Sequence, residues 1–403
     1  MTIQTFLIWI TATFFYAYQY LLRVIPNVLK TDISETFQFD SFLFGQFAGV
    51  WYIGYTLAHI PVGIALDRYG PRKVLPICAL ICALGLSPLI LAENGIYPIM
   101  GRFIWGIGST GATLGMFKIV EMYFSKDQFA KVISLSCIIG VLGAMLGAGP
   151  FMLSLVKLYT WKNILYTFIL IGLMLSVIML FILPKSPSIK SQNILSTLKT
   201  LLSNKLLWII SLGSGFLAGP LEGYADAWAM NSLMVIYNFL ESTASQASFV
   251  IFLGFIFGLL SVSYLIKFLG HHSSLVIQGL ILFFAFCLIL SGQIPFPIIF
   301  GCLFMLGFCS SYQVITVELT IRLFPANMTG LTTAVFNMIM MAFGSFFHTI
   351  IGIGMNMFTT YDSNGKPLCD ALSFQYGLSI IPIMTLIGTL CFIYLRKYRP
   401  LQK

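Results

Sequence analysis

Long apolar runs, broken only by short polar segments, are the feature that most limits what this chain can fold into. Hydrophobic residues make up 58% of its 403 residues, and the mean hydropathy is +0.93, which is more than the core of a soluble protein holds. A hydrocarbon layer about 30 Å thick is crossed by roughly 20 helical residues. Twelve runs meet this requirement, at about residues 6–29, 42–66, 74–92, 96–124, 129–156, 163–183, 206–231, 243–266, 274–292, 296–322, 328–357 and 372–395.

The runs are continuously apolar and do not alternate with polar residues, which is typical of membrane helices and not of barrel strands. We therefore predict an all-α polytopic membrane protein with twelve transmembrane helices and short loops. The first run has no basic segment before it and no small-residue cleavage site after it. It is expected to be a retained helix and not a signal peptide.

The positions of the charged residues predict the orientation of the chain. If both ends lie on one side of the membrane, that side holds Arg68, Arg72, Lys73, Lys126, Lys131, Lys185, Lys190, Lys199, Lys205, Lys267, Arg322, Arg396, Lys397, Arg399 and Lys403. The other side holds only Lys30, Lys157, Lys162 and Lys366, with seven acidic residues. Because cytoplasmic loops carry the excess of Lys and Arg, both termini are predicted to be cytoplasmic, in the cell (inner) membrane. The net charge of +9 is then an orientation signal and does not indicate nucleic-acid binding.

A polar segment near the middle divides the chain into two similar halves. Its prolines, serines and lysines predict a cytoplasmic linker at residues 185–205, between six-helix bundles at 1–184 and 206–403. Shifting the sequence by 200 positions aligns Gly54 with Gly254, Gly70 with Gly270, Gly101 with Gly301 and Phe124 with Phe324. Such a parallel repeat predicts two pseudo-symmetric bundles with a binding site between them near mid-membrane. Chance similarity between apolar segments is the alternative.

The loop between the second and third spans, "GIALDRYGPRK", carries an unusual density of charge. Gly63 permits close helix packing and Gly70 permits a tight reversal. Asp67 can accept hydrogen bonds from Arg68 or Arg72, or face the positive N-terminus of the span that begins near Asn327. The predicted consequence is a cytoplasmic latch that breaks when this side opens. Simple anchoring at the membrane surface is the alternative, but it does not explain Asp67.

This loop resembles the G-x-x-x-D-R-x-G-x-R-[RK] signature of the major facilitator superfamily. The matching positions are Gly63, Asp67, Arg68, Gly70, Arg72 and Lys73. The resemblance implies two six-helix bundles that rock about a central site to give alternating access. In the second half, "IKFLGHHSS" places Lys267 where Asp67 stands, so the same latch chemistry is not expected there.

The fourth span adds a second, weaker resemblance. In "GRFIWGIGSTGA", Arg102 takes the place of the arginine that precedes a glycine-rich helix in that superfamily. Gly106, Gly108 and Gly111 formally match G-x-G-x-x-G. A dinucleotide site would need a preceding strand, so these glycines are expected to allow close helix packing.

Charged residues inside the spans are expensive and are therefore candidates for function. On the first span, Tyr16, Gln19, Tyr20 and Arg23 share one helical face. We predict that the Arg23 guanidinium binds a substrate carboxylate through a fork of two N–H donors. The other predicted members of this site are Tyr52, Tyr55 and His59 on span two and Glu222 and Asp226 on span seven.

Glu222 or Asp226 is expected to take an ammonium group or a proton, and His59 is a further candidate for proton coupling. The alternatives are a permanent pairing of Arg23 with one of these acids, or side chains that reach the membrane surface. For His59 the alternative is a structural hydrogen bond to a tyrosine.

A second layer of charge lies near the cytoplasmic ends of spans four and ten. Lys118 and Glu121 are three residues apart, and Glu318 and Arg322 are four apart. Pairing within each helix accounts for much of this pattern. Participation in the inner gate, with Arg72 exchanging between Asp67 and Glu121, is the other interpretation.

These features predict a secondary active transporter, driven by protons, for a small zwitterionic or anionic solute such as an amino acid, a short peptide or an organic acid. Multidrug or metabolite efflux by proton antiport and facilitated-diffusion uniport are the alternatives. No nucleophile with its base and no metal or cofactor motif is found, so no enzyme, metal or cofactor is predicted. The expected partners are the solute, a proton or other coupling ion and the bilayer, with the chain as a monomer.

Overall fold

The computed structural model describes residues 2–184, 194–325, 328–361 and 367–397. The described residues form eighteen α-helices, one π-helix (η1) and two strands of two residues each. In chain order they are α1 (Ile3–Val24), α2 (Pro26–Phe37), α3 (Ser41–Tyr69), α4 (Pro71–Leu84), α5 (Ser87–Leu91), α6 (Ile96–Tyr123), α7 (Lys126–Ala148), α8 (Pro150–Leu158), α9 (Trp161–Ile182), α10 (Ile194–Leu202), α11 (Lys205–Leu217), η1 (Gly219–Ala225), α12 (Ala229–Tyr237), α13 (Glu241–Leu290), α14 (Phe296–Cys309), α15 (Tyr312–Ile321), α16 (Thr329–Phe358), β1 (Thr360–Tyr361), β2 (Pro367–Leu368), α17 (Ala371–Leu378) and α18 (Ile380–Leu395).

The helices account for twelve membrane spans, as predicted. Within the described ranges, ten helical segments are long and apolar enough to cross a membrane. One of them, α13, has 50 residues and is interrupted at Gly270, whose φ of 73° and ψ of 163° are not helical. Counting α13 as two spans, and the segment from α11 through η1 to α12 as one, brings the ten to twelve. The all-α polytopic fold is therefore confirmed.

Glycine makes the same turn in both halves of the sequence. Gly70, between α3 and α4, has a φ of 78°, and Gly270, which the 200-residue shift aligns with it, has a φ of 73°. Only glycine adopts this backbone conformation readily, because it has no Cβ. The repeat predicted from sequence is thus visible in the backbone at these two positions.

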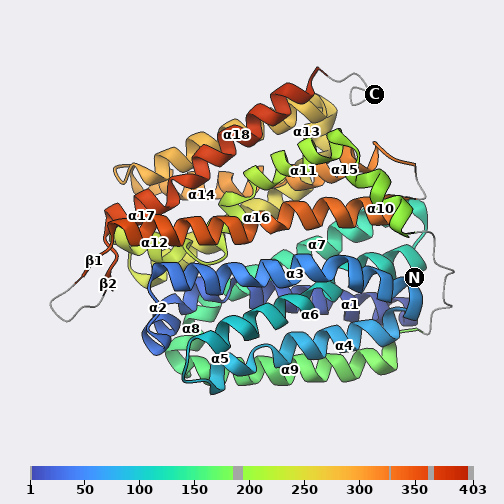
Figure 1. Cartoon of the computed structure of the whole chain (residues 1–403), viewed down its shortest axis with the longest axis horizontal. Helices are drawn as coiled ribbons and strands as arrows, with labels where there is room; N and C mark the ends of the chain where they lie inside the picture. The colour runs from blue at the N-terminus through green and yellow to red at the C-terminus, as the bar shows by residue number, and fades with distance from the viewer. Residues whose placement is uncertain (1, 185–193, 326–327, 362–366, 398–403) are drawn as a thin grey trace. The chain divides into compact units, whose positions relative to one another are not determined.

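The chain separates into two compact units. The first comprises Met1–Gln38 and Val50–Gln192. In it α1 packs on α6 and α7, while α4 packs on α6 and α9, and Figure 1 shows α4 and α9 running side by side. The helices approach closely because glycines face neighbouring backbone: a Cβ on Gly106 would lie 2.2 Å from the carbonyl oxygen of Trp51. This agrees with the packing role expected for the glycines of α6.

The second unit comprises Phe39–Gly49 and Asn193–Lys403. Here α13 packs on α14 and α18, and α16 packs on α11 and α17. Residues 185–193 of the predicted linker lie outside the described residues. Its remainder is not extended: α10 packs on α11 and α16 through an apolar cluster of Leu201, Leu207, Val335 and Ile339. The leucines of α10 therefore make this part of the linker a helix. The lysines and serines of the segment had not indicated a helix.

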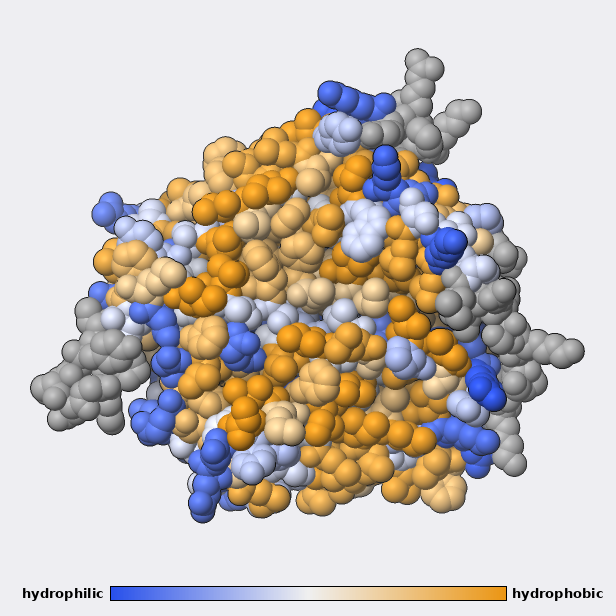
Figure 2. Space-filling model, viewed as in Figure 1, coloured by the Kyte–Doolittle hydropathy of each residue, from blue (hydrophilic) through white to orange (hydrophobic). Residues whose placement is uncertain are grey.

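Large apolar side chains cover the outside of the helices. Figure 2 shows hydrophobic residues along the lengths of the helices on the face drawn, with hydrophilic residues gathered at the helix ends. Phe181 and Phe268, for example, are 78% and 77% exposed. Exposed apolar surface on this scale is stable only in contact with lipid.

The close packing of α14 leads to a testable stability difference between two of its glycines. A Cβ on Gly307 would lie 1.7 Å from the carbonyl oxygen of Ile251, whereas a Cβ on Gly301 meets no atom within 4 Å. Overpacking of this kind costs about 1–3 kcal/mol. We expect Gly307→Ala to lower the melting temperature of the detergent-solubilised protein by several degrees, and Gly301→Ala to leave it unchanged or raise it slightly, because alanine favours a helix more than glycine does. Equal melting temperatures would contradict the packing of α14 against α13.

Candidate functional site

Arg23 is the centre of a buried aromatic group in the first unit. Its side chain, on the last turn of α1, is only 2% exposed. The guanidinium carbon lies 4.4 Å from the ring centroid of Tyr20, 5.8 Å from that of Trp51 and 6.0 Å from that of Tyr52. The negative faces of aromatic rings stabilise a cation at such distances. Three of the predicted site residues, Arg23, Tyr20 and Tyr52, are therefore brought together.

The same face of α1 carries Tyr16 and Gln19. The rings of Tyr16 and Tyr20 meet edge to face, 5.0 Å between centroids. Gln19 is 1% exposed, and its Oε1 is buried without a hydrogen-bond donor among the described residues. A buried amide oxygen without a donor is unfavourable, so this position suits a ligand that brings an N–H or O–H group.

The aromatic face of α3 continues the group. Trp51 stacks on Tyr55, with 4.8 Å between centroids and 17° between planes. The Tyr55 hydroxyl is 2.9 Å from the Thr113 hydroxyl on α6. Trp51, which sequence reasoning missed, thus links Arg23 to Tyr55. Its spacing of four residues from Tyr55 was the signal that could have revealed it.

His59 has a local hydrogen bond on α3. Its Nδ1 lies 3.1 Å from the backbone oxygen of Tyr55, and its ring packs at 4.6 Å on that of Tyr55. A carbonyl can only accept, so Nδ1 carries the proton. This is the kind of structural bond named as the alternative for His59, and its role in proton coupling stays a prediction.

Arg102 positions the end of α1. Its Nη2 donates to the backbone oxygen of Arg23 over 2.8 Å, and its guanidinium lies 4.1 Å from the Trp105 ring. Carbonyls in the last turn of a helix lack helical partners. Arg102 therefore completes the helix end that carries Arg23.

Glu222 and Asp226 lie together in the second unit, on a widened helical turn. Both are buried, at 0% and 1% exposed. Glu222 belongs to the π-helix η1, and Asp226 caps it. Gln313 Nε2, from α15, donates to Glu222 Oε1 over 2.9 Å. Sequence reasoning expected an ordinary α-helical turn here, and π-helical turns occur frequently at functional sites.

A second pair of buried residues adjoins these acids and was missed by sequence reasoning. The indole Nε1 of Trp228 donates to Nδ1 of His348 over 3.0 Å. The Phe44 ring meets the Trp228 ring edge to face at 5.2 Å. His348 is the only ionisable residue in α16, which is the signal that could have identified it.

The charged segment predicted as a loop is helical up to Tyr69, and the end of α3 pairs with α6 inside the first unit. Asp67 Oδ1 lies 3.1 Å from Lys118 Nζ, and Glu121 Oε2 lies at the same distance from that nitrogen. Sequence reasoning expected Arg68 or Arg72 as the partner of Asp67. The Lys118 side chain is only 17% exposed, so its charge needs carboxylates nearby. Asn327, the other expected neighbour of Asp67, lies outside the described residues.

The other basic residues of this segment lie at the end of α3 and the start of α4. Arg68 lies over the ring of Tyr69, with 5.3 Å to the centroid. Arg72 is half-buried, and Lys73 is exposed.

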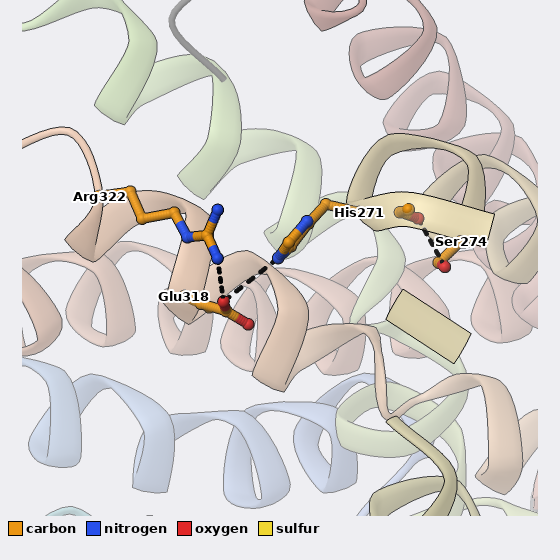
Figure 3. Close-up of polar contacts among 5 residues, drawn as sticks. His271, Ser274, Glu318 and Arg322 are labelled. Carbon is orange, nitrogen blue, oxygen red and sulfur yellow. Dashed lines mark hydrogen bonds and ion pairs between the residues drawn. The ribbon is translucent and has the colours of Figure 1, made fainter. Parts of the chain in front are cut away.

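The second unit contains a similar cluster with the opposite polarity. Figure 3 shows Arg322 and His271 approaching the carboxylate of Glu318 from two directions. Arg322 Nη2 lies 2.6 Å from Glu318 Oε1, and His271 Nε2 lies 3.2 Å from the same oxygen. The 200-residue shift aligns Glu318 with Lys118. In each unit, therefore, one charged residue, Lys118 or Glu318, has two charged neighbours. One neighbour is on the same helical segment, and the other is at the turn between the two preceding helices.

His271 reaches Glu318 because of the turn at Gly270. The Ser274 hydroxyl donates to the backbone oxygen of Gly270 over 2.7 Å, which closes the first turn after the break (Figure 3). In this half Lys267 stands where Asp67 does, and His271, just beyond the aligned glycine, supplies the contact from the hairpin to Glu318.

No metal site is found among the described residues. No group of three His, Cys, Asp or Glu side chains there is arranged to hold a metal ion. The cysteines of the described ranges are all free thiols.

Comparisons with known proteins agree with this architecture. The sequence profile described as the Major Facilitator Superfamily matches residues 8–349. The chain is 28% identical over 139 residues to the multidrug resistance protein MdtL of Salmonella typhi, covering 33% of this chain and 34% of that protein. With MdtL of Klebsiella pneumoniae strain 342 the identity is 31% over 138 residues, again covering 33% and 34%. The chain thus spans about a third of the length of the curated relatives it matches.

Several solved structures share the fold. A bacterial homologue of the human lysosomal transporter Spinster superposes with a TM-score of 0.76, at 16% identity over 98% of both chains. The nucleoside transporter NupG gives 0.75, at 17% identity over 99% of this chain and 100% of that one. A D-xylose-proton symporter gives 0.74, at 14% identity over 96% and 97%.

Proposed function

Because this chain belongs to the major facilitator superfamily, we propose that it is a secondary active transporter of a small zwitterionic or anionic organic solute, coupled to protons. That it is a multi-pass membrane transporter and not an enzyme follows from the family itself. The solute class and the coupling are the proposal. Bundles 1–184 and 206–403 are the two parts that move to give alternating access.

The observation that carries the proposal is the burial of Arg23 among aromatic rings. A buried cation in a membrane protein costs several kcal/mol and is retained for a purpose. Its planar fork of N–H donors matches a carboxylate, with which it forms two parallel hydrogen bonds. One helical turn away, Gln19 presents a buried oxygen that has no protein donor among the described residues. A solute with an anionic group and a nearby N–H or O–H satisfies both residues.

The acids of η1 supply the coupling site. Glu222 and Asp226 are buried carboxyl groups, in the π-helix η1 and at its C-cap. A carboxylate in a low-dielectric environment is stabilised by a proton or by a cation. Coupling then requires that one of these carboxyl groups exchange its proton as the site opens to either side, and Asp226 is the residue we assign to it.

The basic loops are assigned to the cytoplasm by their lysine and arginine content. The Asp67–Lys118–Glu121 cluster then lies at the cytoplasmic ends of α3 and α6, and we assign it to the inner gate.

This gate assignment is tested by two variants that each remove one carboxylate from Lys118. Asp67→Asn separates α3 from α6, whereas Glu121→Gln leaves that contact in place because Glu121 shares a helix with Lys118. We expect a cysteine placed at Arg72 to react faster with a soluble maleimide in Asp67→Asn than in Glu121→Gln. Both pairs are partly exposed, so each is worth at most about 1 kcal/mol of stability, and both variants should fold. Equal labelling in the two variants would count against the gate.

Multidrug efflux by proton antiport is the second candidate. It is favoured by the relatives named multidrug resistance protein MdtL, at 28–31% identity over a third of the chain. For this candidate we take a lipophilic cation as the test substrate, because the aromatic rings around Arg23 would then be its binding surface.

A melting-temperature screen of the purified protein separates the two candidates. A ligand that binds only the folded state raises the melting temperature. We expect amino acids, dipeptides or small carboxylic acids to stabilise the protein, and lipophilic cations to have no effect. Stabilisation by lipophilic cations alone would replace the proposed function with efflux.

A further inference from the structure

The two buried histidines make hydrogen bonds of opposite character. Of the four histidines, all within the described residues, His59 and His348 are the buried pair. His59 Nδ1 faces a backbone oxygen, so it donates in the neutral and in the protonated ring alike. His348 Nδ1 faces the indole N–H of Trp228. Because the indole nitrogen can only donate, His348 Nδ1 has to accept, and the proton of the neutral ring stands on Nε2.

Protonation therefore affects only one of these two contacts. In the imidazolium form both ring nitrogens are donors. The bond from Trp228 to His348 cannot survive that change, whereas the bond from His59 to Tyr55 can. We propose that His348 is a proton-linked positioning residue of the transport cycle, and that its protonation breaks the Trp228 hydrogen bond. The inference rests on the proposed function. It assigns the part that a histidine plays in proton coupling to His348 and not to His59.

Trp228 connects His348 to the acids of the site. The tryptophan follows Asp226 by two residues, and its backbone N–H donates to the Tyr224 oxygen of η1 over 2.9 Å. Release of the indole frees the end of the π-helical segment on which Glu222 and Asp226 stand. A proton on His348 is thereby linked to the position of the carboxyl groups that bind the coupling proton.

His348 also lies where the start of α3 packs on α16. A Cβ on Gly45 would be 2.4 Å from the His348 backbone oxygen, and a Cβ on Gly352 would be 2.6 Å from that of Ser41. The contact is bordered by two side-chain hydrogen bonds, from Asn356 Nδ2 to Asp40 Oδ2 over 2.7 Å and from Gln46 Nε2 to Thr349 Oγ1 over 3.1 Å. Phe44 in the same segment holds the Trp228 ring. Movement of Trp228 therefore loosens residues 39–49.

Other ionisable groups stand on the elements that pack around α16, and three of the carboxylates accept hydrogen bonds from other side chains. Glu222 accepts from Gln313, Asp40 from Asn356 and Glu318 from Arg322. The others are Tyr224 in η1, Asp226 at its end, Tyr312 on α15, Arg322 after α15, Lys199 on α10, Lys205 on α11, Tyr376 on α17, and Cys391 and Tyr394 on α18. Among them, Asp226 is two residues from Trp228, which contacts His348. The charge of Asp226 therefore acts most directly on the hydrogen bond between Trp228 and His348.

The test uses full-length protein in detergent and needs no transported solute. Ring-nitrogen NMR of the histidines is recorded between about pH 5 and pH 8, the range in which histidine titrates. We expect one signal of the Nε2–H tautomer that is absent in His348→Asn and that protonates on acidification. The indole signal of Trp228 should shift over the same pH range. In Trp228→Phe, the His348 signal should lose its single tautomer.

A labelling experiment checks the coupling to α3. Ser41 is buried, whereas Ser291 is exposed, so Ser41→Cys is compared with Ser291→Cys in a Cys369→Ser background. The rate of the maleimide reaction at Ser41→Cys is divided by the rate at Ser291→Cys, because this ratio cancels the pH dependence that any thiol shows. We expect this ratio to rise several-fold on acidification, and to be independent of pH once His348→Asn is added, because asparagine Oδ1 accepts from Trp228 at any pH.

Two results would overturn the proposal. One is a His348 ring that stays neutral throughout the range in which the protein remains folded. The other is a labelling ratio with the same pH dependence in His348→Asn as in the parent. Neither result bears on whether a solute is carried, so failure here is distinguishable from failure of the proposed transport function.

Discussion

Arg23→Lys is expected to weaken strongly the stabilisation of the protein by zwitterionic or anionic solutes, while the protein remains folded. Lysine keeps the positive charge within reach of the Tyr20 ring but loses the planar pair of donors. Hydrogen bonds to a charged group contribute about 1.5–3 kcal/mol each, so loss of one of two weakens binding roughly 10- to 150-fold. The measurement is the ligand-induced change in melting temperature, with a dissociation constant from titration of the solute that stabilises the parent protein most.

Arg102→Lys is the matched control for this prediction. Both arginines are 2% exposed and lie over aromatic rings, but Arg102 contacts the backbone of Arg23. We expect Arg102→Lys to lower the melting temperature of the ligand-free protein and to reduce affinity only in part. The reverse pattern, with affinity intact in Arg23→Lys and lost in Arg102→Lys, would remove Arg23 from the binding site.

Asp226→Asn is expected to abolish solute accumulation in proteoliposomes with an imposed proton gradient while leaving solute exchange intact. The amide has almost the shape of the carboxyl group, yet it cannot gain or lose a proton in this range. Binding and the movement between states can continue, but their link to the proton gradient is broken. Accumulation and exchange are measured in the same vesicles, with the solute identified in the melting-temperature screen.

Glu222→Gln separates the two acids of η1. The oxygen of the new amide can still accept from Gln313, so the local bond of the parent is retained. If Asp226 is the coupling group, Glu222→Gln should keep accumulation within a few-fold of the parent. Unchanged accumulation in Asp226→Asn, or its complete loss in Glu222→Gln alone, would reject the assignment.

Several features of the site were visible in the sequence because they depend on local properties. Buried charge in an apolar run is conspicuous, so Arg23, Arg102, Glu222 and Asp226 could be named without a structure. Helical spacing likewise placed Tyr16, Gln19 and Tyr20 on one face with Arg23. The interpretation of Gly70 required only that a tight reversal needs a positive φ, which the structure confirms at 78°.

The partners of these residues could not be predicted in the same way. Asp67 was expected to contact Arg68, Arg72 or the start of the span near Asn327, whereas Lys118, 51 positions away, is its partner. The contact between Trp228 and His348 spans 120 positions. Such pairings depend on how each helix is rotated about its axis and on how closely glycines let it approach its neighbour, and no pattern within one helix encodes either quantity.

By itself, the sequence determined that this chain crosses a membrane about twelve times as a helical protein with repeated hairpin turns, because hydropathy, helix length and glycine conformation are properties of short segments. Only the tertiary structure decided that Arg102 completes the helix end beneath Arg23, that η1 is a π-helix, and that His348 accepts its hydrogen bond from Trp228. These outcomes arise from packing between distant segments, where one contact distance of about 3 Å decides whether a buried polar group is satisfied.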